Sequence, residues 1–333
     1  DRRPQWQGAA HRDDPLWGPF TARLCMMAQR GFYTLCLLIM GIGWGATIPL
    51  TKVAVSEGYQ EFGLIFWQQI ICAFVLGIVL CIRRQGVGLG RPQIVAYVII
   101  AVFGTVLPNT ASYEAAVHLP GGVLAILIST VPMFAFPIAL LLGIERFSWR
   151  RTAGLCLGLF SVMLMVAPET SLPEKMAVVF IPIALIAPIF YAFEGNYVAK
   201  WGIGGLDPVQ ALFGASLVGS VISLILALGS GQFIYPRGPW GMPDYAFVTS
   251  SLMHAVIYTA YIWLVGRAGP VFAAQVAYLV TLFGIFWSVW LLDEAYSKYV
   301  WLALSCMLLG IFLVLPRYRK NTRVLAEPSD IGT

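Results

Sequence analysis

The chain has 333 residues, of which 59% are hydrophobic and 11% are charged, and its formal net charge is +5. Roughly a quarter of the residues in a soluble domain are charged, so this composition excludes an ordinary soluble domain and indicates a membrane protein. The sequence contains no lysine-rich tract and no CxxC pair. We therefore expect no nucleic-acid partner, no metal site and no cofactor.

The two ends of the chain differ from the rest. Residues 1–30 mix charges, prolines and aromatic side chains without a signal-peptide core, which predicts a disordered cytoplasmic tail. Met26 would make a natural start for a membrane protein, so the residues before it are a candidate non-native segment. The basic residues 317–333 predict a second cytoplasmic tail.

Ten apolar segments lie between these ends, and each is close to the length of about 20 residues that a helix needs to cross a bilayer. They lie near residues 31–56, 61–82, 92–117, 120–142, 150–167, 176–200, 206–228, 243–267, 269–291 and 298–316. Short stretches rich in glycine, proline or charge separate them. The sequence thus predicts an all-α polytopic membrane protein with ten transmembrane helices.

Lysine and arginine are distributed unequally between alternate loops. If the amino terminus is cytoplasmic, the loops on the opposite side carry only Lys175, Arg237 and Lys298. Cytoplasmic loops are enriched in basic residues. The asymmetry predicts an even number of spans in the inner (plasma) membrane, with both termini in the cytoplasm.

The second half of the chain repeats the first. At an offset of 148 residues Lys52 falls on Lys200 and Gly121 on Gly269, and at 149 ERFS (145–148) falls on EAYS (294–297). This divides the chain into repeats at 31–168 and 176–316 with five spans each. Because five is odd, the second repeat enters the membrane with the opposite orientation, as in secondary transporters.

Three segments carry a resemblance to a known family: GIGWGATIPLTKVA (41–54), the turn between the third and fourth spans, and GIERFSWRRTAGLCLG (143–158) with its counterpart LLDEAYSKYVWLALS (291–305). Over roughly residues 31–316 the chain resembles the EamA-type drug/metabolite transporter superfamily. The resemblance implies two inverted five-helix repeats around a central cavity, alternating access, and export or exchange of small metabolites or amino acids. The second half departs from the pattern, because Val280 or Thr281 stands where the family often has a proline.

Three ionisable side chains lie within spans, namely Lys52, Glu114 and Glu194. An ionised group at bilayer depth costs at least about 2.5 to 3.5 kcal/mol, so it normally faces a wet cavity, finds a partner or takes up a proton. Glu194 shares its helical face with Tyr191 and with no basic residue, while Asn196 projects from another side. We expect Glu194 to line the cavity and either couple transport to protons or bind an amine; the alternative is a contact with the interface or a neighbouring helix.

Glu114 and His118 are four residues apart and can meet on one helical face, either as an outer gate or as an interfacial pair. Lys52 lies at a similar depth and could pair with Glu114. In the eighth span, Ser250, His254, Tyr258 and Tyr261 form one polar stripe, in which His254 either exchanges protons or stays a neutral hydrogen-bonding group. The remaining candidates for the cavity lining are aromatic or hydrogen-bonding residues of other spans: Trp44, Trp67, Gln68, Asn109, Tyr113, Gln275 and Tyr278.

Aromatic walls with one or two carboxylates suit a zwitterion or an organic cation. We therefore predict a secondary active transporter for an amino acid, amine or organic cation, with the lipid bilayer, a small-molecule substrate and, in the coupled case, protons as partners. We expect a monomer or weak homodimer. A membrane-embedded enzyme and a channel are the alternatives; the sequence has no HExxH, GxSxG or Walker A motif.

Overall fold

The structure is a computed structural model, which describes residues 18–56, 58–166, 175–236, 238–268 and 275–314. All regular elements in these ranges are helices. In chain order they are α1 (Gly18–Ser56), α2 (Glu61–Arg83), α3 (Arg91–Ala101), η1 (Val102–Val106), α4 (Leu107–His118), α5 (Gly121–Ile128), α6 (Val131–Leu141), α7 (Trp149–Val166), η2 (Lys175–Phe180), α8 (Ile181–Trp201), α9 (Pro208–Ser230), α10 (Met242–Ala268), α12 (Val276–Leu292) and α13 (Lys298–Val314).

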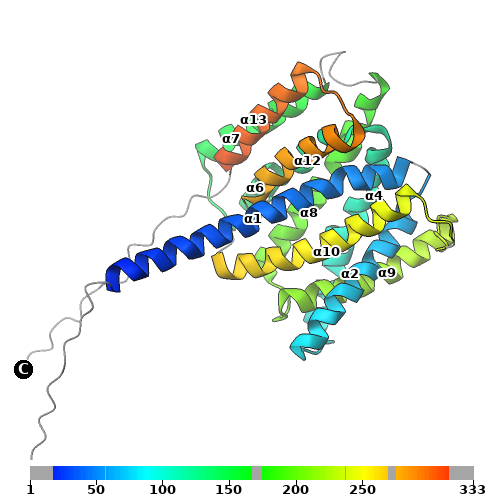
Figure 1. Cartoon of the computed structure of the whole chain (residues 1–333), viewed down its shortest axis with the longest axis horizontal. Helices are drawn as coiled ribbons and strands as arrows, with labels where there is room; N and C mark the ends of the chain where they lie inside the picture. Colours follow the sequence, from blue (N-terminus) through cyan, green and yellow to red (C-terminus); the bar gives the residue numbers. More distant parts are fainter. Residues whose placement is uncertain (1–17, 57, 167–174, 237, 269–274, 315–333) are drawn as a thin grey trace, which may run out of the picture.

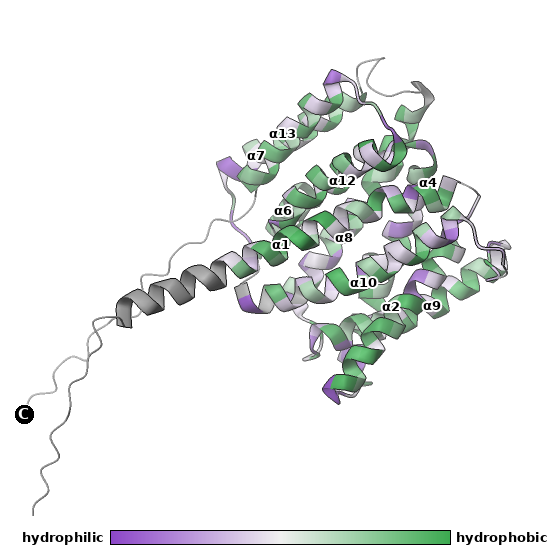
Figure 2. Cartoon of the chain, in the orientation of Figure 1, coloured by the Kyte–Doolittle hydropathy of each residue, from purple (hydrophilic) through white to green (hydrophobic). Residues whose placement is uncertain are grey.

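These elements make ten membrane segments within the described ranges. Seven helical segments are long and apolar enough to cross a membrane, and two shorter apolar helices, α12 and α13, follow them. The remaining segment is α10, which has 27 residues. Figure 2 shows the apolar character of the helices, with hydrophilic residues gathered mostly at their ends and in the connecting loops.

The first helix is longer than the sequence predicts. It begins at Gly18, so residues 18–30, which we expected to belong to a disordered tail, are helical. The segment between Pro19 and Gly31 contains no further proline or glycine, so nothing in it interrupts the helix that follows. Both predicted tails otherwise lie outside the described residues, as do residues 269–274 at the predicted start of the ninth span.

Two of the ten segments are interrupted at prolines. In the third, a π-helical turn, η1, joins α3 to α4 just before Pro108. Proline has no N–H to donate to the carbonyl four residues earlier, which favours such a widened turn. In the fourth, α5 and α6 are separated just before Pro132, and the hydroxyls of Ser129 and Thr130 bond the carbonyls of Ile126 and Leu127 at the end of α5.

The helices pack in a pattern that stays the same when the two halves are exchanged. In the first half α1 packs against α10 and α12, and in the second half α8 packs against α4 and α6. Likewise α2 contacts α10 in the same way as its repeat counterpart α9 contacts α3. The pairs α2–α9, α5–α12 and α7–α13 each join a helix to its own counterpart in the other half. Figure 1 shows α7 beside α13 and α1 between α10 and α12. This is the packing of two inverted repeats.

Small residues allow the closest helix contacts. In the α7–α13 pair, a Cβ atom added to Gly154 would lie 2.7 Å from the carbonyl oxygen of Gly310. In the α1–α12 pair, a Cβ on Gly45 would lie 2.8 Å from the backbone nitrogen of Gly284. Membrane helices associate mainly through such close packing. Both pairs of helices therefore depend on glycine at these positions.

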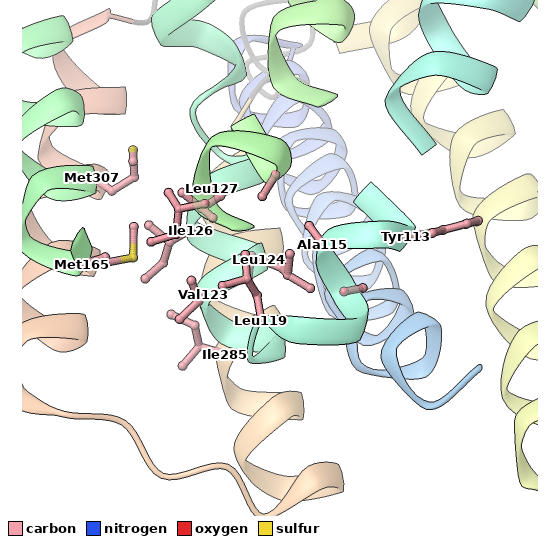
Figure 3. Packing of buried hydrophobic residues seen from close by; sticks show 14 of the residues in the cluster. Tyr113, Ala115, Leu119, Val123, Leu124, Ile126, Leu127, Met165, Ile285 and Met307 are labelled. Carbon is pink, nitrogen blue, oxygen red and sulfur yellow. The ribbon is translucent and has the colours of Figure 1, made fainter. Parts of the chain in front are cut away.

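The largest buried core joins the two halves around α5. Side chains of α5 and of the turn before it lie between α7, α12 and α13 (Figure 3). The fully buried residues labelled there include Leu119, Val123, Ile126, Leu127, Met165 and Met307. This core fixes the position of α5 against both halves of the bundle.

Candidate functional site

A chain of hydrogen bonds links three helices in the middle of the molecule. The hydroxyl of Tyr191 (α8) donates to Oδ1 of Asn109 (α4) at 2.8 Å, and Nδ2 of Asn109 donates to Oε1 of Gln68 (α2) at 2.9 Å. The hydroxyl of Tyr113 donates to the same oxygen of Gln68 at 2.7 Å. Buried polar groups of this kind fix the orientation of the helices that carry them. The structure thus brings four of the predicted residues together.

Glu194 lies next to this chain, one helical turn after Tyr191. Its side chain is close enough to Tyr191 and to Tyr258 on α10 for electrostatic interaction. On its other side it meets the π-turn η1, where a Cβ added to Gly104 would lie 3.3 Å from Cγ of Glu194. Glu194 is partly exposed. Within the described part of the chain, no ion pair or hydrogen bond engages its carboxylate.

An aromatic wall continues from Tyr258. The ring of Trp44 (α1) has its centroid 5.8 Å from that of Tyr258, 5.6 Å from Tyr261 and 5.7 Å from His254. The imidazole of His254 stacks on Tyr258. Nε1 of Trp44 donates to Nδ1 of His254 at 3.2 Å. An indole N–H can only donate, so the imidazole nitrogen must accept and His254 is the neutral form. Three residues of the predicted stripe on α10 therefore face Trp44, while the fourth, Ser250, donates to the carbonyl of Thr47 at 3.4 Å.

We call the set of Trp44, Gln68, Asn109, Tyr113, Tyr191, Glu194, His254, Tyr258 and Tyr261 the central cluster. Its members come from α1, α2, α4, α8 and α10, that is, from both halves of the chain. Carboxylate, amide, phenol and indole groups meet there inside an apolar bundle. Such an arrangement can bind a small polar or charged molecule.

The predicted charged residues at the end of the third span lie outside the central cluster. Nζ of Lys52 donates to the carbonyl oxygens of Ala116 at 3.1 Å and Leu119 at 2.7 Å, at the carboxyl end of α4. A lysine at this position stabilises the exposed carbonyls of a helix end. Oε1 of Glu114 lies 3.9 Å from Nε2 of His118, as their spacing predicts. The ring of His118 also stacks on Phe180.

Four other predicted residues face different neighbours. Asn196 is buried and donates to the carbonyl oxygen of Ala135, which ties α8 to α6. Nε1 of Trp67 donates to the carbonyl of Ile234 at 2.9 Å, in the segment after α9. Gln275 is exposed at the start of α12, and Tyr278 lies within electrostatic reach of Arg150. The structure does not bring these side chains into the central cluster.

Two features of the cluster escape prediction from the sequence. Tyr261 belongs to the predicted stripe, but its role as a partner of Trp44 was missed; it follows Tyr113 by the 148 residues that relate the two halves. Gly104 was missed as well, because the π-turn that presents it to Glu194 has no sequence period of its own. The glycine four residues before Pro108 was the available signal.

A second contact between the halves lies at one end of the bundle. The carboxylate of Glu294, in the α12–α13 loop, accepts hydrogen bonds from the backbone N–H groups of Gly121 at 2.9 Å and Gly122 at 3.4 Å, at the start of α5. The hydroxyl of Tyr296 bonds both Glu294 and the N–H of Gly122. Burial, and next the bond to Glu294, raise the pKa of Tyr296 above its ordinary value. We call this arrangement the Glu294 clasp.

Comparison with known proteins decides the family. The model of the EamA-like transporter family matches residues 31–167 and again residues 179–315. The chain belongs to the EamA-like transporter family. The predicted resemblance is therefore confirmed, and the EamA-like protein is a membrane transporter and not an enzyme.

Individual relatives are distant but span nearly the whole EamA-like chain. It is 23% identical over 301 residues to the "Uncharacterized inner membrane transporter YedA" of Escherichia coli strain K12, covering 88% of this chain and 94% of that protein. The same protein from E. coli strains CFT073 and O157:H7 matches equally. A solved structure titled "Crystal structure of protein" is 17% identical with a TM-score of 0.59, covering 85% of this chain and 96% of its own. That likeness supports the fold of two inverted five-helix repeats.

Proposed function

We propose that this EamA-like protein is a secondary active transporter that moves a small organic metabolite by alternating access, as an exporter or an exchanger. The candidate substrates are an amino acid, an amine or an organic cation. The name of the E. coli relative, an inner membrane transporter, supports the inner membrane as its location. Inverted repeats that meet around a central site are typical of carriers of this class.

The observation that carries the proposal is the position of Glu194. Glu194 projects from α8 against the π-turn η1 and interacts electrostatically with Tyr191 and with Tyr258 of α10, and its carboxylate has no ionic partner within the described ranges. A carboxylate at bilayer depth without such a partner is costly unless a ligand, water or a proton stabilises it. Glu194 therefore either binds the positive charge of the substrate or exchanges a proton during the transport cycle.

The contacts between the halves support alternating access. A carrier of this type must close its central site from one side of the membrane and then from the other. The Glu294 clasp joins the second half to the first at one end. Its repeat counterpart, Glu145, instead pairs with Arg151 at 3.0 Å, within its own half. The two ends of the bundle are thus held by different contacts.

Transport by Glu194→Gln in proteoliposomes, measured across pH, tests the role of the carboxylate. We expect the rate to fall by about tenfold or more, since a hydrogen bond to a charged group contributes about 1.5 to 3 kcal/mol. If Glu194 exchanges protons, the variant also loses the pH dependence of the wild type. The matched control is Glu145→Gln, which removes an exposed carboxylate in a loop. An unchanged rate together with an unchanged pH profile in Glu194→Gln would rule out both roles.

The same vesicles distinguish a carrier from a channel, the alternative that remains. A carrier shows saturable uptake. Substrate on the opposite side of the membrane accelerates this uptake, because the binding site then returns with substrate bound. A channel shows flux without saturation and without this counterflow. We expect saturation and counterflow, with the protein acting as a monomer or weak homodimer and both termini in the cytoplasm.

A further inference from the structure

The electric charge of the central cluster limits the class of metabolite that it can bind. The inference about this class rests on the proposed transport function. Glu194 is the acidic residue of the cluster, and its other members are phenols, amides, an indole and an imidazole. The imidazole of His254 is uncharged because it accepts the N–H of Trp44. With Glu194 ionised, the described residues of the cluster therefore carry one negative charge.

The nearest lysines along α1 and α8 are engaged at helix ends. Lys52 lies eight residues beyond Trp44 on α1, about 12 Å along the helix axis, and donates to the carbonyls of Ala116 and Leu119. Lys200 lies six residues beyond Glu194, about 9 Å along α8, and donates to the carbonyl of Leu142 at 2.9 Å. Both ammonium groups are directed to the backbone of neighbouring helices.

Several N–H and O–H donors of the cluster are directed to neighbouring protein groups. The hydroxyls of Tyr191 and Tyr113 and an amide N–H of Asn109 are bonded in the chain that ends at Gln68. The indole N–H of Trp44 is bonded to His254. A substrate carboxylate placed here would lie near the charge of Glu194, and the donors named above would have to leave their protein acceptors to bind it. The cluster therefore disfavours an anionic group.

A cation finds the opposite conditions. The carboxylate of Glu194 offers an ionic partner and interacts electrostatically with Tyr258, whose ring packs against those of Trp44 and Tyr261. The faces of such rings attract cations and also accept an apolar body. Glu194 has Ala46 as its counterpart in the first repeat. The negative charge is thus an addition to one half only.

We propose that the substrate is an organic monocation without a carboxylate, an amine with an apolar body rather than a zwitterionic amino acid. Glu194 binds the ammonium group, and the aromatic wall of Trp44, Tyr258 and Tyr261 receives the rest of the molecule. This assigns the substrate class among the three that the proposed function leaves open.

Matched ligands that differ only in the carboxylate test this class on the wild-type protein. One set is phenylethylamine, phenylalanine methyl ester and phenylalanine; the aliphatic set is isopentylamine, leucine methyl ester and leucine. Thermal shift of the purified protein reports binding, and counterflow of each labelled compound in proteoliposomes reports transport. We expect the amines and esters to bind at least about tenfold more tightly than the amino acids, a difference of about 1.4 kcal/mol.

The variants Glu194→Gln and Glu145→Gln then test whether the preference for amines depends on the carboxylate of Glu194. The first variant should lose the preference for amine over amino acid, whereas the second, in an exposed loop, should keep it. If the amino acids bind and exchange as well as the amines, the monocation inference is wrong while the transporter proposal stands. If none of the compounds binds or exchanges although the protein is folded and inserted, the monocation inference is overturned, and the saturation and counterflow test described above decides the transporter proposal separately.

Discussion

At the residue scale, the central cluster combines two kinds of contact. The amide and phenol groups of Gln68, Asn109 and Tyr113, from the first half, form a hydrogen-bonded chain with Tyr191. The aromatic wall comes mainly from α10, in the second half, and joins Trp44 of α1. The two halves therefore share a packing pattern but contribute different chemistry, and Glu194 lies where these contributions meet.

His254 supports Trp44 within this wall, which predicts how substitutions at this position behave. His254→Leu leaves the indole N–H without its acceptor, whereas Oδ1 in His254→Asn can replace Nδ1. We expect transport by the Leu variant to fall by about tenfold, since an unpaired buried donor costs about 1 to 3 kcal/mol. The Asn variant should retain most of the activity, and tryptophan fluorescence should report the environment of Trp44. Equal losses in both variants would contradict the supporting role.

At the scale of elements, the spans were predictable and their mutual contacts were not. The lengths of apolar segments follow from the thickness of the bilayer, so most predicted boundaries agree with the helices to within a few residues. The contact of Glu114 with His118 was predictable too, because residues four apart share a helical face. In contrast, Trp44 and His254 are 210 residues apart. No sequence period fixes which faces of two distant helices meet.

The start of α5 shows the same distinction. The repeat places Glu294 opposite Glu145 in sequence, but only the structure shows that Glu294 accepts hydrogen bonds from Gly121 and Gly122. Lys52 is a comparable case, because its sequence position suggests a partner such as Glu114 while its ammonium group bonds backbone carbonyls. Charges within membrane helices are rare enough to be noticed in a sequence, yet their partners depend on the tertiary structure.

The Glu294 clasp predicts unequal effects of two matched substitutions. Glu294→Ala removes the acceptor of the N–H groups of Gly121 and Gly122 and should lower the free energy of unfolding by about 1 to 3 kcal/mol. Glu145→Ala removes a partly exposed ion pair, in which the side chain of Glu145 is 40% and that of Arg151 15% exposed, and should cost about 1 kcal/mol or less. Thermal unfolding of the purified variants measures both. Equal changes in melting temperature would show that the clasp contributes no more than the Glu145–Arg151 pair.

At the scale of the whole molecule, loops from the two halves meet at both ends of the bundle. At one end, Nε2 of Gln93 donates to the carbonyl of Gly204 at 2.7 Å, joining the start of α3 to the α8–α9 connection. At the other, the hydroxyl of Tyr59 donates to Oδ1 of Asp244 at 2.6 Å, joining the α1–α2 connection to the start of α10. This grouping agrees with the alternation of loops on which the predicted orientation rests.

Cysteine labelling in cells tests that orientation, because the arginine-rich loops are expected to face the cytoplasm. Four exposed positions, two at each end of the bundle, are suitable in a background without native cysteines: Gln85→Cys and Arg146→Cys at the arginine-rich end, and Gln60→Cys and Ala295→Cys at the other. We expect a membrane-impermeant maleimide to label Gln60→Cys and Ala295→Cys in intact cells. The other two should react only after permeabilisation.

The pattern of labelling separates two kinds of failure. Gln60 precedes α2 and Ala295 precedes α13, so these positions share one side only if the number of spans between them is even, as it is when ten helices cross the membrane. If Gln85→Cys and Arg146→Cys are labelled in intact cells and the other two are not, the predicted fold stands but the orientation is reversed. Both termini would then lie outside the cell. If the members of a pair differ from each other, at least one of the intervening helices does not cross. Because α12, with 17 residues, is the shortest single-helix span between Gln60 and Ala295, the reaction at Ala295 is a direct measure of whether this helix crosses the membrane as the fold requires.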